Sequence, residues 1–420
     1  MPAASRTPAL SRRLQGLAPS ATMAMLGRVH ALRSQGLEIL DLTAGEPDFP
    51  PPEAASRAGI EAIRQGRGKY TPAAGLPELR AEAAGAIQSL AGLSYSPSEV
   101  VVTSGAKPAL SQAFLALVDP GDQVLIPAPF WTSYPEIVRI AEGEPVLVPC
   151  DAAHLPDLEA LEAARTGRTV ALLLNTPCNP TGAVYPQALL CSIGAWALEH
   201  GIWVISDEIY AALVYHGARH VSPLAAVPGL RERGVWIGGT SKAYSMTGWR
   251  IGFLAAPEPL AKAVGDLQSQ LNSCPPAISQ YAALAALREG LDDREAMRKV
   301  FQDRRDRVLE ALRAIPGVEV SDPQGAFYAF PGIPGHLGSR DPATGRQIES
   351  GDDLAEVLLE ADRVAAIGGR AFGAPAAFRI SFAASQGTLD AALGRIAARI
   401  RSLTPPAGTE ADAAGQSAKG

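Results

Sequence analysis

The chain has 420 residues, of which 47% are hydrophobic and 19% are charged, and its formal net charge is -6. A chain of this length can bury a large core and predicts more than one domain. The negative charge argues against a nucleic-acid-binding surface. No apolar run reaches the roughly 18 residues that a membrane-spanning helix needs, so we expect neither a membrane nor a nucleic-acid partner.

The four cysteines lie far apart, without a CxxC pair: Cys150, Cys178, Cys191 and Cys274. In a chain this long, such scattered cysteines do not indicate a disulfide framework. Arg6, Arg12 and Arg13, with no acid before Glu38, resemble a transit peptide, but the apolar core of a secretory signal is missing. We therefore expect a cytoplasmic protein, and we expect no metal site.

Residues 1–47 are predicted to be an N-terminal arm that also joins a smaller domain, with residues 1 to about 10 loose. Residues 48–292 are predicted to form a large domain in which apolar runs alternate with helical patterns. Several runs are apolar at consecutive positions, which suits a mostly parallel sheet buried on both faces. The runs are Val100–Thr103, Gln123–Pro127, Pro145–Val148, Thr169–Leu174, Ile202–Ser206, Val235–Gly238 and Ile251–Ala255.

The pattern changes after about Leu291. A long charged helix over Asp293–Ala314 leads into a mixed region that ends near Arg401. We predict a smaller α+β domain over residues 293–402. Residues 403–420 are rich in Ala, Gly, Pro and Ser and are predicted to form a disordered tail.

The run Gly238–Arg250, GGTSKAYSMTGWR, directly follows an apolar strand and lies between two such strands. Alone, Lys242 would be an ordinary turn lysine. Ser241 and Arg250, however, are donors of the kind that a phosphate needs. A carbonyl cofactor needs an amine that is held neutral in a desolvated site. The run therefore points to a site for a phosphorylated carbonyl compound.

The run Ser206–Tyr210, SDEIY, stands at the carboxyl end of a strand, where open α/β sheets bind ligands. Asp207 can pair with a pyridinium nitrogen and keep it protonated. Tyr210 can donate to a phenolate oxygen. Alone, Asp207 would be read as a helix N-cap.

Two further runs follow strands. In Asn175–Gly182, NTPCNPTG, two X-Pro steps give a rigid turn that can present the Asn179 amide, although this is also ordinary turn chemistry. Cys178 in this turn is expected to pack rather than react. In Thr103–Leu110, TSGAKPAL, a strand enters a glycine turn and a helix, whose first amides can cradle phosphate.

Together, LTAGEPDF with Gly45, NPTG with Asn179, SDEIY with Asp207 and SKxxxMTGWRxG with Lys242 resemble the class I aminotransferases. The similarity is greatest to bacterial Ib-type aspartate aminotransferases and runs from about residue 10 to 400. It implies the fold type I of pyridoxal-phosphate-dependent transferases. That fold is α/β, with a mostly parallel seven-stranded sheet between helices and a smaller α+β domain.

The resemblance implies pyridoxal 5'-phosphate as cofactor, with Lys242 as its Schiff-base lysine and as the general base. It makes Asp207 the partner of the ring nitrogen, places Tyr210 and Asn179 at the ring oxygen, and stacks Trp131 on the ring. The residues implied for the phosphate are Gly105, Ala106, Lys107, Ser241, Arg250 and, reaching from a neighbouring subunit, Tyr70. Alanine replaces a common glycine at position 106, but its amide can serve equally if its φ is negative. The reach of Tyr70 implies an obligate homodimer with shared active sites.

For the substrate, the resemblance implies that Arg379 in FRISF binds the α-carboxylate, a planar fork meeting a planar anion. Alone, Arg379 would be a surface arginine at a strand end. Gly45, Trp131 and Asn179 would line the same cavity.

Lys107 and Thr22, the latter in Pro-Ser-Ala-Thr, match residues that recognise a distal carboxylate. They favour L-aspartate as amino donor and 2-oxoglutarate as acceptor, in a ping-pong reaction. Relatives that accept prephenate often carry a lysine where this chain has Ala18, which argues against prephenate. Aromatic and alanine-type substrates remain open.

Two other classes compete with an aminotransferase. One is a pyridoxal-phosphate-dependent carbon–sulfur lyase. The other is the ligand-sensing domain of a transcription regulator, but only about 40 residues precede Gly45, too few for two DNA-binding helices and a linker.

Overall fold

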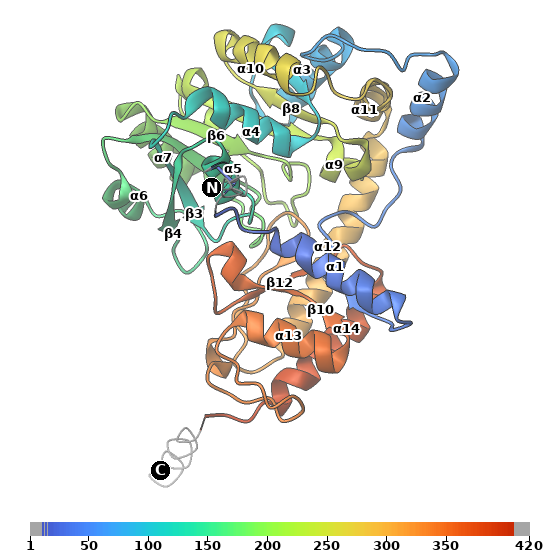
Figure 1. Ribbon diagram of the computed structural model, residues 1–420, viewed down its shortest axis with the longest axis vertical. Helices are drawn as coiled ribbons and strands as arrows, with labels where there is room; N and C mark the ends of the chain where they lie inside the picture. Colours follow the sequence, from blue (N-terminus) through green and yellow to red (C-terminus); the bar gives the residue numbers. More distant parts are fainter. Residues whose placement is uncertain (1–10, 12, 15, 407–420) are drawn as a thin grey trace, which may run out of the picture.

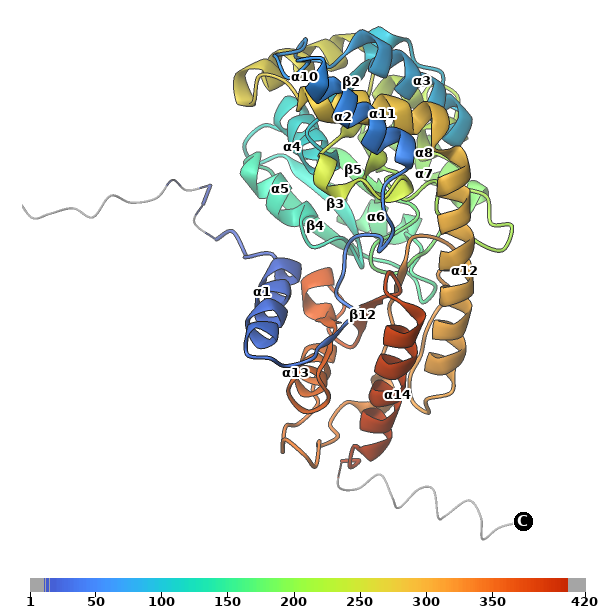
Figure 2. The same ribbon diagram turned by 90° about the vertical axis from the view of Figure 1, so that its right-hand side faces the viewer.

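The computed structural model describes residues 11, 13–14 and 16–406. Figure 1 shows a large sheet covered by helices and, below it, a smaller group of helices and short strands. The long helix α12 (Leu291–Arg313) runs along both parts, as Figure 2 shows from the side. The predicted helix over Asp293–Ala314 is therefore present, and it begins two residues earlier.

The large sheet has seven strands in the order β2-β8-β7-β6-β5-β3-β4. All neighbours are parallel except β8, which is antiparallel to both β2 and β7. The fold predicted from the sequence is thus confirmed. The strands are β2 (Val100–Thr103), β3 (Gln123–Ala128), β4 (Glu144–Pro149), β5 (Thr169–Asn175), β6 (Trp203–Asp207), β7 (Gly234–Gly239) and β8 (Gly252–Ala255).

Successive residues of the strands enter two different apolar clusters, one on each face of the sheet. On β5, Leu172 and Leu174 belong to one cluster and Leu173 to the other. This explains why the strands are apolar at consecutive positions. The helices around the sheet are α2 (Glu53–Arg64), α3 (Pro77–Ala91), α4 (Ala106–Leu117), α5 (Tyr134–Ile140), α6 (Leu158–Ala164), α7 (Gln187–Glu199), α8 (Pro223–Ala226), α9 (Thr240–Ala243), α10 (Glu258–Leu271) and α11 (Ala277–Glu289).

The smaller part holds a three-stranded antiparallel sheet in the order β11-β12-β9. Its apolar cluster joins residues of α12, α13 and α14, such as Phe301, Leu358 and Ile396. Its elements are β9 (Tyr328–Ala329), α13 (Gly351–Asp362), β10 (Val364–Ala365), β11 (Ile367–Gly368), β12 (Phe378–Ser381) and α14 (Gln386–Ser402). Single 3-10 turns are η1 (Pro97–Glu99), η2 (Leu230–Arg233), η3 (Thr247–Trp249), η4 (Pro334–His336) and η5 (Gly369–Phe372).

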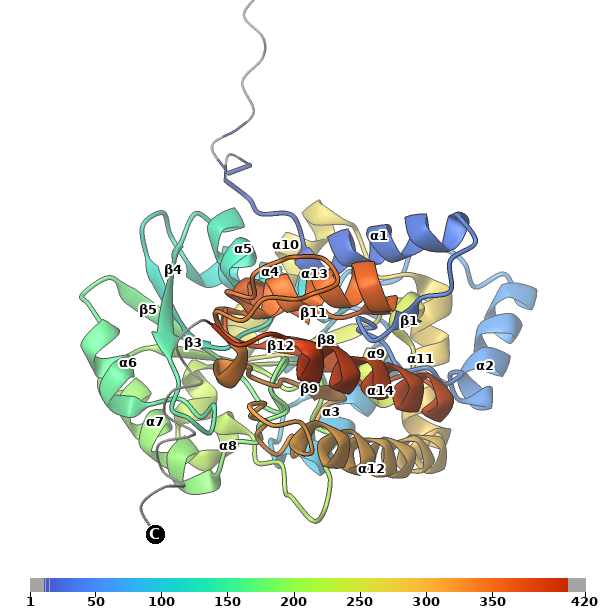
Figure 3. The ribbon, with the colours of Figure 1, turned by 90° about the horizontal axis from the view of Figure 1, so that it is seen from below.

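The N-terminal segment packs on this smaller part. Strand β1 (Leu40–Asp41) pairs in parallel with β10, and Met25 and Val29 of α1 (Ala21–Ser34) share a cluster with Leu359 of α13. Figure 3 shows α1 and β1 beside α13 and α14. The proposed domain boundaries after residues 47 and 292 stay predictions.

The start of the predicted C-terminal tail is ordered. Leu403 is buried, and the backbones of Thr404 and Arg340 exchange hydrogen bonds of 2.8 and 2.9 Å. The ordered chain therefore continues beyond residue 402, because Leu403 completes the core of the smaller part. Residues 407–420 of the predicted tail and the predicted loose start, 1–10, lie outside the described residues. Among the described helices, none is long and apolar enough to cross a membrane.

Candidate active site

Lys242 lies just beyond the end of β7. The connection that was predicted as a plain turn contains the single helical turn α9, and Lys242 is its third residue. Its Nζ donates a hydrogen bond to the carbonyl oxygen of Gly45. Burial lowers the pKa of Lys242 to about 8; Glu46 opposes the shift, and the guanidinium of Arg250 adds to it. The side chain is thus an amine that can lose its proton near neutral pH.

Asp207 is the last residue of β6, and only 3% of it is exposed. Its Oδ2 accepts a hydrogen bond from the Tyr134 hydroxyl at 2.8 Å, and its Oδ1 accepts one from the Ile209 amide at 3.2 Å. Burial raises the pKa of Asp207 to about 6, although the hydrogen bond from Tyr134 works against the rise. A turn follows rather than a helix, so Asp207 is not an N-cap.

The loop after β5 is tied to the end of β6 by Asn175. Its Nδ2 donates to the carbonyl oxygen of Asp207 at 2.9 Å, and its Oδ1 accepts from the amide of Asn179 at 2.8 Å. On the same side, the hydroxyls of Tyr210 and Tyr328 lie 3.0 Å apart. Burial raises the pKa of Tyr210 well above its usual range, so Tyr210 keeps its proton and can donate it to a hydrogen bond.

Arg379 of β12 is 1% exposed, so it is not the surface arginine that the bare sequence allows. Its Nη1 donates to Oδ1 of Asn179 at 3.0 Å, and its Nη2 donates to the carbonyl oxygen of Thr43 at 3.1 Å. Its carbon Cζ stands 4.3 Å from the centre of the Tyr328 ring. Within the described chain its Nε has no partner, and no acid forms an ion pair with this buried cation. An uncompensated buried charge of this kind calls for an anionic ligand.

The start of α4 meets Arg250. Gly105, which precedes the helix, has φ 101°, and a Cβ added there would stand 2.4 Å from Nη2 of Arg250. Ala106 has no positive φ, so its amide belongs to the open first turn of the helix. Burial and then Arg250 lower the pKa of Lys107, whose Nζ lies 4.8 Å from the centre of the Trp131 ring. Amides and a guanidinium together suit a phosphate.

These side chains line one cavity of about 580 Å³ between the large sheet and the smaller part. Twelve of the residues expected at the site line it: Thr22, Gly45, Ala106, Lys107, Trp131, Asn179, Asp207, Tyr210, Ser241, Lys242, Arg250 and Arg379. Gly105 lies beside it, against Arg250. Tyr70 does not line it and is 89% exposed.

The sequence family Aminotransferase class I and II matches residues 38–396. The chain belongs to this family. An aspartate aminotransferase of Rhizobium meliloti is 44% identical to the aminotransferase described here over 395 residues, covering 93% of this chain and 96% of the relative. A bifunctional aspartate aminotransferase and glutamate/aspartate-prephenate aminotransferase of Petunia hybrida is 42% identical, covering 94% and 84%.

Solved structures agree with this assignment. The crystal structure of the Rhizobium meliloti aspartate aminotransferase superimposes with a TM-score of 0.91 at 42% identity, over 95% of this chain and 100% of the other. The aspartate aminotransferase of Thermus thermophilus with maleate gives 0.86 at 41% identity, over 93% and 100%. The fold of this aminotransferase is therefore fold type I.

Among the other lining residues, four bond directly to the predicted ones and had no predicted role: Thr43, Tyr134, Asn175 and Tyr328. Tyr134 stands three residues after Trp131, and Asn175 opens the turn NTPCNPTG that contains Asn179, so Asn175 lay within a run already singled out. Tyr328 lies in the run Phe327–Phe330, which is typical of a core strand. Only the contact with Tyr210 distinguishes it.

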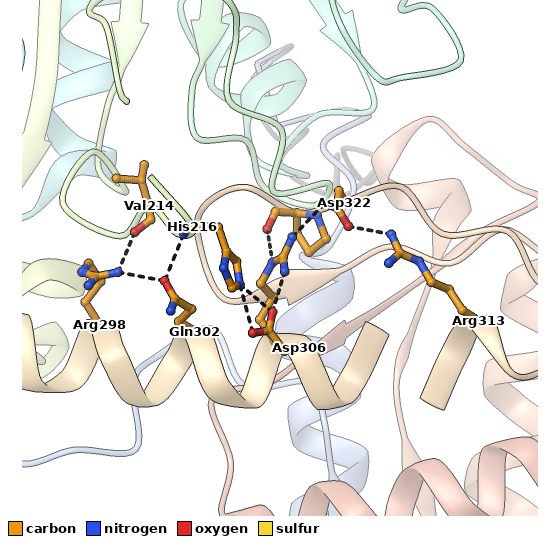
Figure 4. A network of polar contacts seen from close by, with 9 residues as sticks. Val214, His216, Arg298, Gln302, Asp306, Arg313 and Asp322 are labelled. Atoms are coloured by element: carbon orange, nitrogen blue, oxygen red, sulfur yellow. Dashed lines mark hydrogen bonds and ion pairs between the residues drawn. The ribbon is translucent and has the colours of Figure 1, made fainter. Parts of the chain in front are cut away.

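The segment after Tyr210 is fixed to α12 by a polar network, which Figure 4 shows. The carbonyl oxygen of Val214 accepts from Nη1 of Arg298 at 3.1 Å, and the amide of His216 donates to Oε1 of Gln302 at 3.0 Å. Nε2 of His216 lies 2.8 Å from Oδ1 of Asp306. In the aminotransferase, α12 thus supports the part of the chain that carries Tyr210.

Proposed function

We propose that this aminotransferase binds pyridoxal 5'-phosphate at Lys242 and moves the amino group of L-aspartate to 2-oxoglutarate in a ping-pong reaction. One observation carries the proposal. The cavity places a lysine of lowered pKa between a buried carboxylate, Asp207, and a buried arginine without an acidic partner, Arg379.

The residues present fit this cofactor. Each oxygen of Asp207 accepts one hydrogen bond and keeps a lone pair, which can take the ring N–H. The first turn of α4 and Arg250 offer donors to a phosphate. Lys242 offers the amine that an aldehyde needs. When bound, the cofactor withdraws electrons from the amino acid and so makes its Cα proton acidic.

Three side chains of the enzyme have separate roles in the proposed reaction. With the cofactor bound, the amine of Lys242 would be the base that takes and returns a proton at the substrate Cα, which its pKa of about 8 permits near neutral pH. Tyr210 keeps its proton and donates a hydrogen bond to the ring oxygen. Arg379, held by Asn179 and Thr43, binds the α-carboxylate and orients the amino acid.

Lys107 and Thr22 support an acidic substrate. Both line the cavity, and the ammonium of Lys107 is held over Trp131. A distal carboxylate of the substrate could meet this cation in the same cavity that Arg379 lines. The Rhizobium relative is named an aspartate aminotransferase, and the Thermus thermophilus enzyme was solved with maleate, so similar proteins are associated with dicarboxylic ligands.

We further propose a cytoplasmic homodimer in which Tyr70 reaches the phosphate of the neighbouring subunit. Its support is the exposure of Tyr70 and of two apolar side chains on α2, Ile60 and Ile63. Such exposed apolar groups mark surfaces that a partner covers. Sedimentation of the purified enzyme tests the dimer.

A panel of amino donors with 2-oxoglutarate tests the reaction. We expect the highest kcat/KM with L-aspartate, and keto acid beyond one equivalent per active site only when an acceptor is present. Prephenate is included as acceptor, because the relative from Petunia carries that activity in its name. Continued turnover to keto acid without any acceptor would show a lyase instead, and a preference for alanine or aromatic donors would refute the aspartate assignment.

A further inference from the structure

The carboxylate of Glu208, the neighbour of Asp207, is buried outside the cavity. Its side chain is 0% exposed, and it accepts hydrogen bonds from Oγ of Ser206 at 2.8 Å and Oγ of Ser222 at 2.5 Å. Nε2 of His220, a side chain that is 3% exposed, lies 2.7 Å from its Oε2. None of these four residues lines the cavity that holds Asp207.

The hydrogen bonds fix the charge of this cluster. Three groups that can donate converge on the two oxygens of Glu208, which is the pattern that an ionised carboxylate satisfies. Nδ1 of His220 is buried, and no described residue bonds to it. Nε2 is thus the ring atom of His220 that faces Glu208. Within the described residues, no lysine or arginine forms an ion pair with this carboxylate.

This charge acts on the neighbouring carboxylate. Burial is the main cause that raises the pKa of Asp207, and the charge of Glu208 raises it further. A negative potential that holds a proton at Asp207 equally favours a proton on a ring nitrogen bonded to Asp207. Because the four residues of the cluster are buried, little solvent screens the effect of the Glu208 charge on Asp207.

We propose that Glu208 is a positioning residue. Its buried charge, held by Ser206, His220 and Ser222, strengthens the hydrogen bond between Asp207 and the protonated ring nitrogen of the cofactor. This inference rests on the proposed binding of pyridoxal 5'-phosphate. The same three hydrogen bonds hold the end of β6, and so hold Asp207 in place.

The test uses the enzyme loaded with ¹⁵N-labelled pyridoxal 5'-phosphate. Glu208→Gln keeps the size but removes the charge. Its amide oxygen can accept from the hydroxyls of Ser206 and Ser222, and its amide nitrogen can donate to Nε2 of His220 when the ring proton is on Nδ1. We expect the ¹⁵N shift of the ring nitrogen to move toward that of a neutral pyridine, and cofactor affinity to fall about tenfold. Glu208→Asp, which restores the charge, should recover most of the wild-type shift.

The control is Glu232→Gln, since the side chain of Glu232 is 65% exposed and pairs with Arg231 at the surface. It should leave the ¹⁵N shift unchanged. A wild-type shift and affinity in Glu208→Gln would overturn the proposal. Should that variant not fold, Ser222→Ala removes one donor and leaves the charge of Glu208 less compensated. The ring nitrogen should then keep its proton at least as firmly as in the wild type, and a ¹⁵N shift that moves toward neutral pyridine would count against the proposal.

Asp207→Asn separates this inference from the proposed function. If that variant keeps a protonated ring nitrogen, the proposed cofactor site itself is wrong. If it loses the proton while Glu208→Gln does not, only the role of Glu208 is wrong.

Discussion

The side-chain carbonyl of Asn179 accepts a hydrogen bond from Nη1 of Arg379 at 3.0 Å. Asn179 belongs to the loop after β5 of the large sheet, and Arg379 belongs to β12 of the smaller part. The guanidinium of Arg379 is therefore oriented by residues of both parts at once. Any movement of one part against the other changes the direction of this guanidinium.

Replacing Arg379 should chiefly weaken substrate binding. The loss of a buried charge-assisted contact costs about 2–5 kcal/mol, so Arg379→Leu should lower kcat/KM for aspartate by about thirtyfold to several thousandfold. Arg379→Lys should recover only part, because an ammonium has no planar fork. Steady-state kinetics measures both. Arg370→Leu, at an arginine that is exposed in the same part, is the control, and an equal loss there would refute the assignment.

Lys242→Ala should abolish transamination, because both the covalent attachment of the cofactor and the proton transfer at Cα depend on this amine. We expect a loss of several orders of magnitude in single-turnover rate. The long-wavelength absorbance of the lysine-bound cofactor should also disappear. Turnover near the wild-type rate would disprove the role of Lys242.

The pKa of about 8 at Lys242 predicts a pH dependence. Only the neutral amine attacks an aldehyde, and this amine is protonated below pH 8 and neutral above it. The rate of covalent attachment of pyridoxal 5'-phosphate to the cofactor-free enzyme should therefore rise with pH and level off with a midpoint near 8. Stopped-flow absorbance measures this rate. A midpoint near the ordinary lysine pKa of about 10.4 would contradict the desolvated environment.

Gly105→Ala should disturb Arg250. The added methyl would stand 2.4 Å from Nη2 of Arg250, and φ of 101° is strained for alanine. We expect the affinity for pyridoxal 5'-phosphate to fall about tenfold, since one charged contact to a phosphate is displaced. Equilibrium dialysis measures it. Gly85→Ala is a matched control, because nothing lies within 4 Å of a Cβ there, and it should bind the cofactor normally.

Lys107→Ala distinguishes substrate recognition from cofactor binding. If Lys107 binds a distal carboxylate, kcat/KM should fall about tenfold to a hundredfold for aspartate and 2-oxoglutarate, and little for alanine. Equal losses for all substrates would instead assign Lys107 to the cofactor. Lys262→Ala changes an exposed lysine that pairs with Asp266 and should have no effect.

The strands of the large sheet could be predicted closely from the sequence, because each is mostly apolar and all but the edge strand β4 are buried along most of their length. The run predicted over Pro145–Val148, for example, is β4 with one more residue at each end. The order of the strands could not be predicted in this way. An apolar run does not show which strands it pairs with, so the sequence did not identify β8 as the antiparallel strand between β2 and β7.

The chemistry-bearing residues were predictable where a motif set them apart, as at Lys242 and Asp207. The residues that hydrogen-bond to them could not be predicted. Tyr134 and Tyr328 occur in aromatic runs that packing alone explains, and only the fold brings their hydroxyls to Asp207 and Tyr210. The helical turn α9 was also missed, because one turn is too short to give a periodic pattern.

The pairing of β1 with β10 has a consequence for synthesis of the chain. Leu40 leaves the ribosome early, but its strand partner, Val364, lies near the other end of the sequence. Until that partner is made, the apolar residues Leu40 and Leu42 have no core to enter. The N-terminal segment can therefore complete its strand pairing only after the chain has been made as far as Ala365, and the backbone that leads to Gly45 is fixed late.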